Sequence, residues 1–200
     1  MAYRVLMLGW ELPPFNTGWL GEACLGLIRA LSKKGIRITF VLPKKVDLDL
    51  DIAELVFADV DEGSGQILEA YTSYKTWTRL FPTDSFPEPQ NYIAGAIKYA
   101  EKVGLLLKQY GEKFDVIHAH DWMTYPAAIA AKRILKKPLV VHVHSTEFDR
   151  TGGNYPNREV YSIEKRGFEE ADRVILVGGF MENVLIQKYE VNPDKIKVVY

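Results

Sequence analysis

The sequence predicts an α/β domain whose sheet is Rossmann-like, doubly wound and mainly parallel, with about six or seven strands. Short apolar runs bounded by turn residues alternate along the chain with segments whose apolar residues recur at helical spacing. This alternation is typical of strands joined by crossover helices. The 200 residues, 48% of them hydrophobic, suffice for one such domain with a substantial core.

In the first part of the chain, strands are expected at residues 3–9 and 36–42, because both are apolar runs that end at a glycine or a proline. Between them, a loop with two prolines and the glycines beside Trp19 precede a helix over 22–34. Gly35 ends that helix, as glycine commonly does one residue past the last turn.

Residues 44–90 are expected to form an irregular insertion, apart from a possible strand at 55–60. Its second half, 71–89, is rich in aromatic residues, threonine, serine and proline and shows no helical or strand period. Long excursions of this kind in compact domains are often functional.

The remainder of the chain returns to regular alternation, with a polar loop at 145–157 and no internal repeat. The expected strands are 114–119, 139–144, 173–177 and 195–200, and the expected helices are 91–110, 125–136, 156–171 and 181–189.

Bulk properties exclude several classes of protein. The formal net charge is -1 with no block of basic residues, which argues against nucleic acid as a partner. No stretch approaches the ~18 apolar residues of a membrane span, so no membrane association is expected. Cys24 is the only cysteine, so the chain forms no intramolecular disulfide, and a reducing cytoplasm is the expected location.

All four histidines lie at the ends of two consecutive predicted strands, in the strings His118-Ala119-His120-Asp121-Trp122 and His142-Val143-His144-Ser145. Ligands of open parallel sheets bind beyond the carboxyl ends of the strands. Because side chains alternate along a strand, the two histidines of each pair share one face. A single such histidine is more often structural, but two clusters together indicate a functional cleft.

Other polar loops at this edge add candidate ligand groups. The loop 16–21 precedes a helix, where backbone N–H groups suit a phosphate or a sugar hydroxyl, although glycines there also make plain turns. Glu147, Asp149 and Arg150 could bind sugar hydroxyls and an anionic group, or form a solvated loop. Trp122, like Tyr125 and Tyr155, could stack on a sugar ring or pack at the sheet edge.

These residues resemble a known family. The string Gly-Trp-Glu-Leu-Pro-Pro at 9–14, the glycine loop, the string His-Ala-His-Asp-Trp at 118–122 and the approach Ala-Asp-Arg-Val-Ile at 171–175 are similar to the amino domain of GT-B retaining glycosyltransferases. Within that fold, the chain most resembles the glycogen/starch synthase and sucrose-phosphate synthase group. The resemblance covers essentially the whole chain.

The resemblance implies transfer of a hexosyl group, in particular glucosyl, from ADP-glucose or UDP-glucose to a glucan or sugar acceptor, with retention of configuration and without a metal or other cofactor. It implies that His120 and Asp121 are catalytic. It implies that Gly18, Trp19 and Gly21 approach the donor phosphates and sugar. The implied substrate-binding residues are Trp122, His144, Glu147, Asp149 and Arg150.

The chain departs from the family pattern in three ways. Trp19 stands where the family loop has a second glycine, and Gly178-Gly179 stand where a serine is usual. Family members also continue past the last strand into a donor-binding carboxy-terminal domain. Residues 1–200 are therefore expected to be the acceptor-side half, inactive by itself, with that domain as its partner.

Two alternatives stay open at this point. His118, His120, Asp121, His142 and His144 are ligand types that zinc or a similar ion accepts, which would suit a metal-dependent hydrolase. The chain could also be a non-catalytic carbohydrate-binding half.

Overall fold

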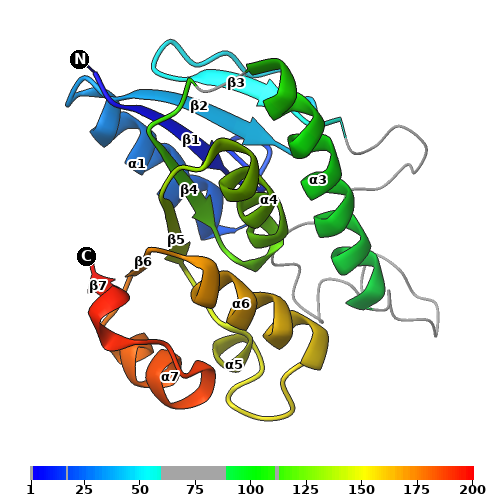
Figure 1. The fold of residues 1–200 in the computed structure, drawn as a ribbon, viewed down its shortest axis with the longest axis vertical. Helices are drawn as coiled ribbons and strands as arrows, with labels where there is room; N and C mark the ends of the chain where they lie inside the picture. Colours follow the sequence, from blue (N-terminus) through cyan, green and yellow to red (C-terminus); the bar gives the residue numbers. More distant parts are fainter. Residues whose placement is uncertain (1, 17, 60–88, 111–112) are drawn as a thin grey trace.

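The computed structural model describes residues 2–16, 18–59, 89–110 and 113–200. Its centre is a seven-stranded sheet in the order β3-β2-β1-β4-β5-β6-β7, with every neighbouring pair parallel (Figure 1). The strands are β1 (Arg4–Leu8), β2 (Arg37–Leu42), β3 (Glu54–Phe57), β4 (Val116–His120), β5 (Leu139–Val143), β6 (Arg173–Leu176) and β7 (Ile196–Val198). The predicted fold class is confirmed.

Helices cover both faces of the sheet. They are α1 (Trp19–Ser32), α3 (Pro89–Tyr110), α4 (Tyr125–Leu135), α5 (Glu147–Arg150), α6 (Arg158–Glu170) and α7 (Phe180–Tyr189), with short 3-10 turns η1 (Trp122–Thr124) and η2 (Pro193–Lys195). Figure 1 shows α3 and α4 on the face toward the viewer and α1 on the far face. Four of the five residues of β1 are buried, as expected for a central strand of a sheet covered on both sides.

The order of the strands creates a switch point between β1 and β4. From β1 the chain builds the sheet outward through β2 to β3, and from β4 it builds outward in the other direction to β7. In such sheets the loops that leave the two central strands diverge to opposite faces and open a crevice at the carboxyl edge. The residues after β1 and after β4 are therefore the first to consider as a site.

Where the structure describes the segment 44–90 before α3, residues 44–53 are irregular as predicted, and the possible strand is present. β3 pairs with β2 from Thr39↔Glu54 to Leu42↔Phe57, which places a strand one residue before the possible strand predicted at 55–60. Thr39 Oγ1 also donates a hydrogen bond to Glu54 Oε2 at 2.8 Å. The aromatic-rich part, 71–88, lies outside the described residues.

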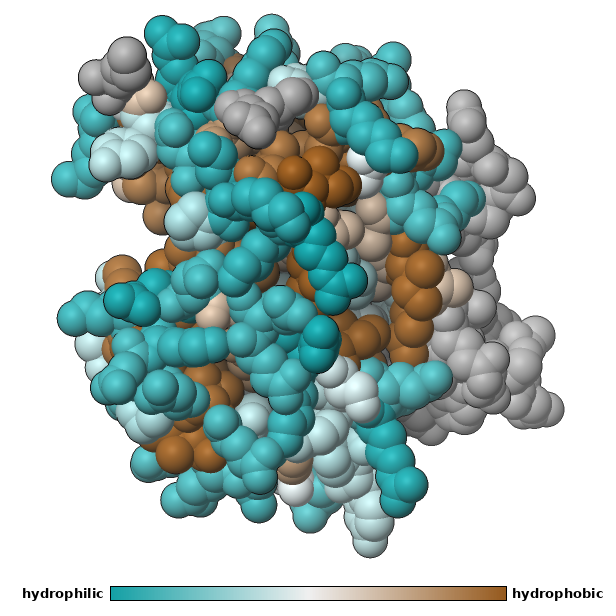
Figure 2. Space-filling model, viewed as in Figure 1, coloured by the Kyte–Doolittle hydropathy of each residue, from teal (hydrophilic) through white to brown (hydrophobic). Residues whose placement is uncertain are grey.

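Hydrophilic residues dominate the face seen in Figure 2, and hydrophobic residues reach the surface in separate patches between them. Among the described residues, no helix combines the length and the apolar composition that crossing a lipid bilayer requires.

Candidate functional site

The four histidines form one cluster on the face of the sheet that α1 covers. In the register of β4 and β5, His120 lies opposite His142, and His118 and His144 extend the row by two residues on either side. Ring centroids are 4.4 Å apart for His118 and His120, 5.2 Å for His120 and His142, and 4.6 Å for His142 and His144. The expectation that each pair shares a face is confirmed. Across the two strands, His142 also contacts His118 and His120, and His120 contacts His144.

Burial keeps these imidazoles neutral near pH 7. Desolvation, together with the smaller effect of neighbouring imidazoles, lowers the pKa of His118 and that of His142 to about 3. Desolvation lowers the pKa of His144 to about 4. The pKa of His120 lies well below its usual range for the same reasons. The cluster therefore offers neutral nitrogen donors and acceptors rather than positive charge.

Only part of the hydrogen-bonding capacity of the cluster is used. His120 Nδ1 lies 3.0 Å from His144 Nε2, so one of these nitrogens donates and the other accepts. Five buried side-chain atoms have no hydrogen-bond partner among the described residues: His118 Nε2, His120 Nε2, Asp121 Oδ2, His142 Nδ1 and His142 Nε2. Unpartnered buried polar atoms are uncommon in folded proteins, and their concentration here indicates that something else binds at this point.

Asp121 is held in a strained conformation at the end of β4. Its φ of 58° and ψ of 168° are rare for a residue with a side chain. The surroundings fix it, because its N–H donates to the His142 carbonyl at 3.0 Å and its Oδ1 accepts from the His144 N–H at 2.7 Å. Thr124 Oγ1 donates to the carbonyls of His120 and Asp121, at 3.0 and 2.9 Å. Burial raises the pKa of Asp121 to about 7, so its carboxyl group exchanges a proton near neutral pH.

The glycine-rich segment differs from the loop predicted at 16–21. Helix α1 begins at Trp19, so Trp19 and Gly21 belong to its first turn and Gly18 precedes it as the N-cap. The Trp19 side chain is 88% exposed and points away from the core. Gly21 is closely packed, because a Cβ there would lie 2.8 Å from Asn16 Cβ, and its N–H donates to Glu11 Oε1 at 3.4 Å.

Cys24, one turn further along α1, connects this helix to the histidines. Its sulfur, one nitrogen of His120 and one of His144 all lie within 4.8 Å of one another. The His120 ring is therefore on the same side of the sheet as the helix that Gly18 and Gly21 start. Burial raises the pKa of the Cys24 thiol well above its usual range. The sequence pattern does not indicate the contact of Cys24 with the histidines, because that contact depends on tertiary packing.

The prediction of a polar loop over 145–157 is wrong for Glu147–Arg150, which form the helix α5. Thr146 Oγ1 accepts from the Asp149 N–H at 3.3 Å, and Asp149 Oδ2 accepts from the Thr146 N–H at 2.7 Å. This is a capping box, and its sequence signature, threonine followed three residues later by an acidic residue, is present at 146–149. The backbone donors at the start of α5 thereby find partners.

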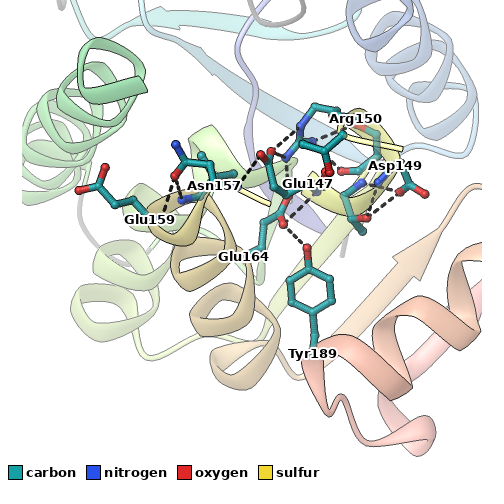
Figure 3. Close-up of polar contacts among 11 residues, drawn as sticks. Glu147, Asp149, Arg150, Asn157, Glu159, Glu164 and Tyr189 are labelled. Carbon is teal, nitrogen blue, oxygen red and sulfur yellow. Dashed lines mark hydrogen bonds and ion pairs between the residues drawn. The ribbon is translucent and has the colours of Figure 1, made fainter. Parts of the chain in front are cut away.

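Glu147 and Arg150 take part in a largely buried network with Glu164 and Tyr189 (Figure 3). Arg150 donates to Glu164 Oε1 at 2.6 Å and to Glu147 Oε2 at 3.1 Å. Glu164 also accepts from the Glu147 N–H at 3.1 Å and from the Tyr189 hydroxyl. Burial raises the pKa of Glu164 even with Arg150 in contact. Sequence reasoning did not single out Glu164 or Tyr189, because both come from helices that carry no local signal of a polar contact.

The aromatic candidates separate into two groups. Trp122 and Tyr125 are buried, at 6% and 1% exposure, so in this structure they pack against the sheet edge. Tyr155 is 97% exposed. Gly178 and Gly179 follow β6 at the same carboxyl edge, and Gly179 is the N-cap of α7.

Comparison with known proteins places this geometry in a family. Residues 21–200 match the model of Glycosyltransferase Family 4. The chain is 26% identical to an uncharacterised glycosyltransferase of Methanocaldococcus jannaschii, covering 98% of this chain and 45% of that protein. It is 27% identical to a glycogen synthase of Mycobacterium tuberculosis, covering 98% of this chain and 47% of that protein. The chain thus spans about half the length of the curated relatives it matches.

Solved structures share the fold. The sucrose-phosphate synthase of Thermosynechococcus elongatus has a TM-score of 0.69 at 14% identity, over 98% of this chain and 47% of that one. The catalytic domain of starch synthase IV from Arabidopsis thaliana, bound to ADP and acarbose, has a TM-score of 0.64 at 16% identity, over 99% of this chain and 51% of that one. With a family model that matches nine-tenths of its length, the chain belongs to Glycosyltransferase Family 4.

Proposed function

We propose that this chain is the acceptor-side half of a retaining hexosyltransferase, which transfers glucose from ADP-glucose or UDP-glucose to a glucan or sugar acceptor. The observation that carries the proposal is the position of His120 and Asp121. They end β4 beside the switch point, and His120 shares a face of the sheet with the glycine-started helix α1. Open parallel sheets bind their ligands at such a point.

Neutral imidazole and a carboxyl group of pKa about 7 suit contacts to an uncharged sugar. A neutral His120 donates or accepts one hydrogen bond through Nε2, which has no protein partner among the described residues. Its ring is completely buried, so contact with a donor sugar requires the side chains around it to move. We assign the sugar contact to His120 and give Asp121 the role of holding the β4–β5 edge and binding acceptor hydroxyls.

The donor nucleotide is assigned to a second, carboxy-terminal domain. The M. tuberculosis and M. jannaschii relatives are about twice the length that this chain matches, and the resemblance to the synthases implies that such a domain binds the nucleotide. In this arrangement Gly18, Trp19 and Gly21 face the donor phosphates from the first domain. The transfer needs no metal ion, and its location is cytoplasmic, in keeping with a free thiol at Cys24.

The acceptor-side residues divide by their present contacts. His144 belongs to the histidine cluster and Trp122 follows Asp121 after β4, whereas Glu147, Asp149 and Arg150 already have protein partners in the network and the capping box. We propose that His144 and Trp122 contact the acceptor directly. The contribution of Glu147, Asp149 and Arg150 is then structural, because their contacts fix the conformation of the α5 turn.

The test is transfer by the full-length protein that contains this chain, measured with ADP-glucose and UDP-glucose on maltooligosaccharide and glycogen. His120→Ala should lower kcat while leaving nucleotide affinity mostly unchanged, because the contact is to the sugar. Product NMR reports the anomeric configuration, and an inverted product contradicts the retaining mechanism. Residues 1–200 alone should fold and show no transfer, because they cannot hold donor and acceptor together.

A metal-dependent hydrolase built on the same histidines is the alternative. Family membership favours transfer, and hydrolysis that requires added metal, in a protein without glucosyl transfer, would favour the hydrolase instead.

A further inference from the structure

Three histidines of the cluster lie close together and carry ring nitrogens that have no hydrogen-bond partner among the described residues. One ring nitrogen from each of His118, His120 and His142 lies within 4.8 Å of the other two. The atoms without hydrogen-bond partners among the described residues include His118 Nε2, His120 Nε2 and both ring nitrogens of His142. Imidazole nitrogens are common ligands of first-row transition metals, and three of them at one place can form a ligand set.

We propose that His118, His120 and His142 form a binding site for a divalent transition metal such as Zn²⁺. Bonds of about 2.0–2.1 Å to a tetrahedral zinc ion place its nitrogen ligands about 3.4 Å apart. The three nitrogens lie within 4.8 Å of one another, so the rings must turn and move closer together to bind one ion. The fourth position remains for water.

The second possible set, Cys24 with His120 and His144, is less suited to the ion. In that set His120 Nδ1 and His144 Nε2 already contact each other at 3.0 Å, so a metal would have to break this hydrogen bond. The first set leaves this contact in place when His120 binds through Nε2, which has no partner among the described residues. The sheet also fixes the backbone of two members, because His120 and His142 are paired in register on neighbouring strands.

The consequence for activity rests on the proposed function. A metal on His120 takes the nitrogen that we assign to the donor sugar, so the ion acts as an inhibitor of transfer and not as a cofactor. Metal binding itself is independent of that assignment and is measured without substrate.

The experiment is titration of the purified, metal-free protein with Zn²⁺ and, separately, with Co²⁺. Calorimetry detects binding of either ion, and visible absorption detects tetrahedral Co²⁺. We expect one ion per chain. His118→Asn and His142→Asn should each weaken binding by at least about tenfold, since loss of even a supporting contact weakens metal sites by 10–100-fold. Cys24→Ala should leave the affinity unchanged, and circular dichroism verifies that each variant is folded.

Two results would overturn the proposal. The first is an absence of saturable binding in the folded wild-type protein. The second is binding that survives both histidine substitutions or is lost in Cys24→Ala, which assigns the ion elsewhere. If Zn²⁺ binds as expected but the protein transfers no glucose, the metal site stands and the proposed function fails. If the protein transfers glucose but binds no metal, the proposed function stands and the metal site fails.

Discussion

Arg150→Met tests whether Arg150 holds the fold together or is free for a ligand. The guanidinium is 21% exposed and donates to Glu164 at 2.6 Å, to Glu147 at 3.1 and 3.2 Å, and to the Ser145 carbonyl and hydroxyl at 3.1 and 3.0 Å. The Glu164 side chain is only 2% exposed. Methionine keeps the apolar volume and removes the charge, so it leaves two carboxylates without their cation.

We expect the free energy of unfolding to fall by about 3 kcal/mol, the lower end of the range for breaking a buried ion pair. The lower end applies because Glu164 keeps two donors, the Glu147 N–H at 3.1 Å and the Tyr189 hydroxyl. Its pKa is already raised by burial, so in the variant Glu164 takes up a proton at a smaller cost than an ordinary carboxylate. The loss of unfolding free energy caused by Arg150→Met should therefore be smaller at pH 5.5 than at pH 8.

The assay is urea unfolding followed by circular dichroism and tryptophan fluorescence, with the slope in urea checked for constancy. Arg166→Met is the matched control: it changes the same residue type, on α6, where Arg166 is 56% exposed and pairs with Glu170 at 2.7 Å. Exposed i,i+4 pairs contribute about 0.5 kcal/mol or less. Adding Glu164→Gln to Arg150→Met should recover part of the loss. Equal, small effects of Arg150→Met and Arg166→Met would refute the reasoning and free Arg150 for an acceptor role.

Three further perturbations probe packing and charge. Gly167→Ala should lower the thermal midpoint, at a cost of about 1–3 kcal/mol, because its Cβ would lie 2.3 Å from Tyr125 Cδ2. Gly26 lies on the exposed side of α1, and a Cβ added there would meet no atom within 4 Å. Gly26→Ala should therefore raise the free energy of unfolding by about 0.5–1 kcal/mol, and a decrease would contradict the helix-propensity argument. Acidification from pH 7 to 5 should destabilise the fold, since His118 and His142 have folded pKa values of about 3, below the ordinary 6.5, so the unfolded chain binds more protons in this window. Each of these two imidazoles then lowers the free energy of unfolding by about 2 kcal/mol at pH 5. Asp121 offsets part of this loss, because its carboxyl group takes up a proton below its pKa of about 7 in the folded protein. A free energy of unfolding in urea that does not change between pH 7 and pH 5 would contradict the burial of the cluster.

The sheet could be predicted because its strands are short apolar runs with clear ends. β1, β4 and β5 lie within the predicted ranges or one residue beyond them, since each is followed by a residue that must leave the sheet, such as Gly9 or the strained Asp121. α1 begins three residues before its predicted start, because Trp19 and Leu20 can enter a helix whose first turn also accepts Gly21. Glycine signals a turn in the sequence, whereas here it allows Asn16 to pack closely.

The histidine cluster could also be predicted in outline, because strand alternation is a local rule. Period two places His118 and His120 on one face, and the parallel pairing of consecutive strands places His142 opposite. The contacts of Cys24, Glu164 and Tyr189 could not be predicted, because they join segments far apart in the chain. Glu164, for example, lies 14 residues from Arg150 and 25 from Tyr189. For α5 the local signal existed in the capping box at 146–149, and the polarity of the segment obscured it.

The polar groups at this edge divide into two populations, and the division separates structural from functional roles. At the start of α5, Arg150, Glu147 and Glu164 bind one another, so their burial is compensated within the chain. At the histidines and Asp121, by contrast, five buried atoms have no partner among the described residues, and Asp121 is also held at a φ of 58°. Unsatisfied buried polar atoms and strained backbone are uncommon and concentrate at functional sites. The compensated network therefore supports the α5 turn, and the uncompensated cluster around His120 is the candidate for the binding site.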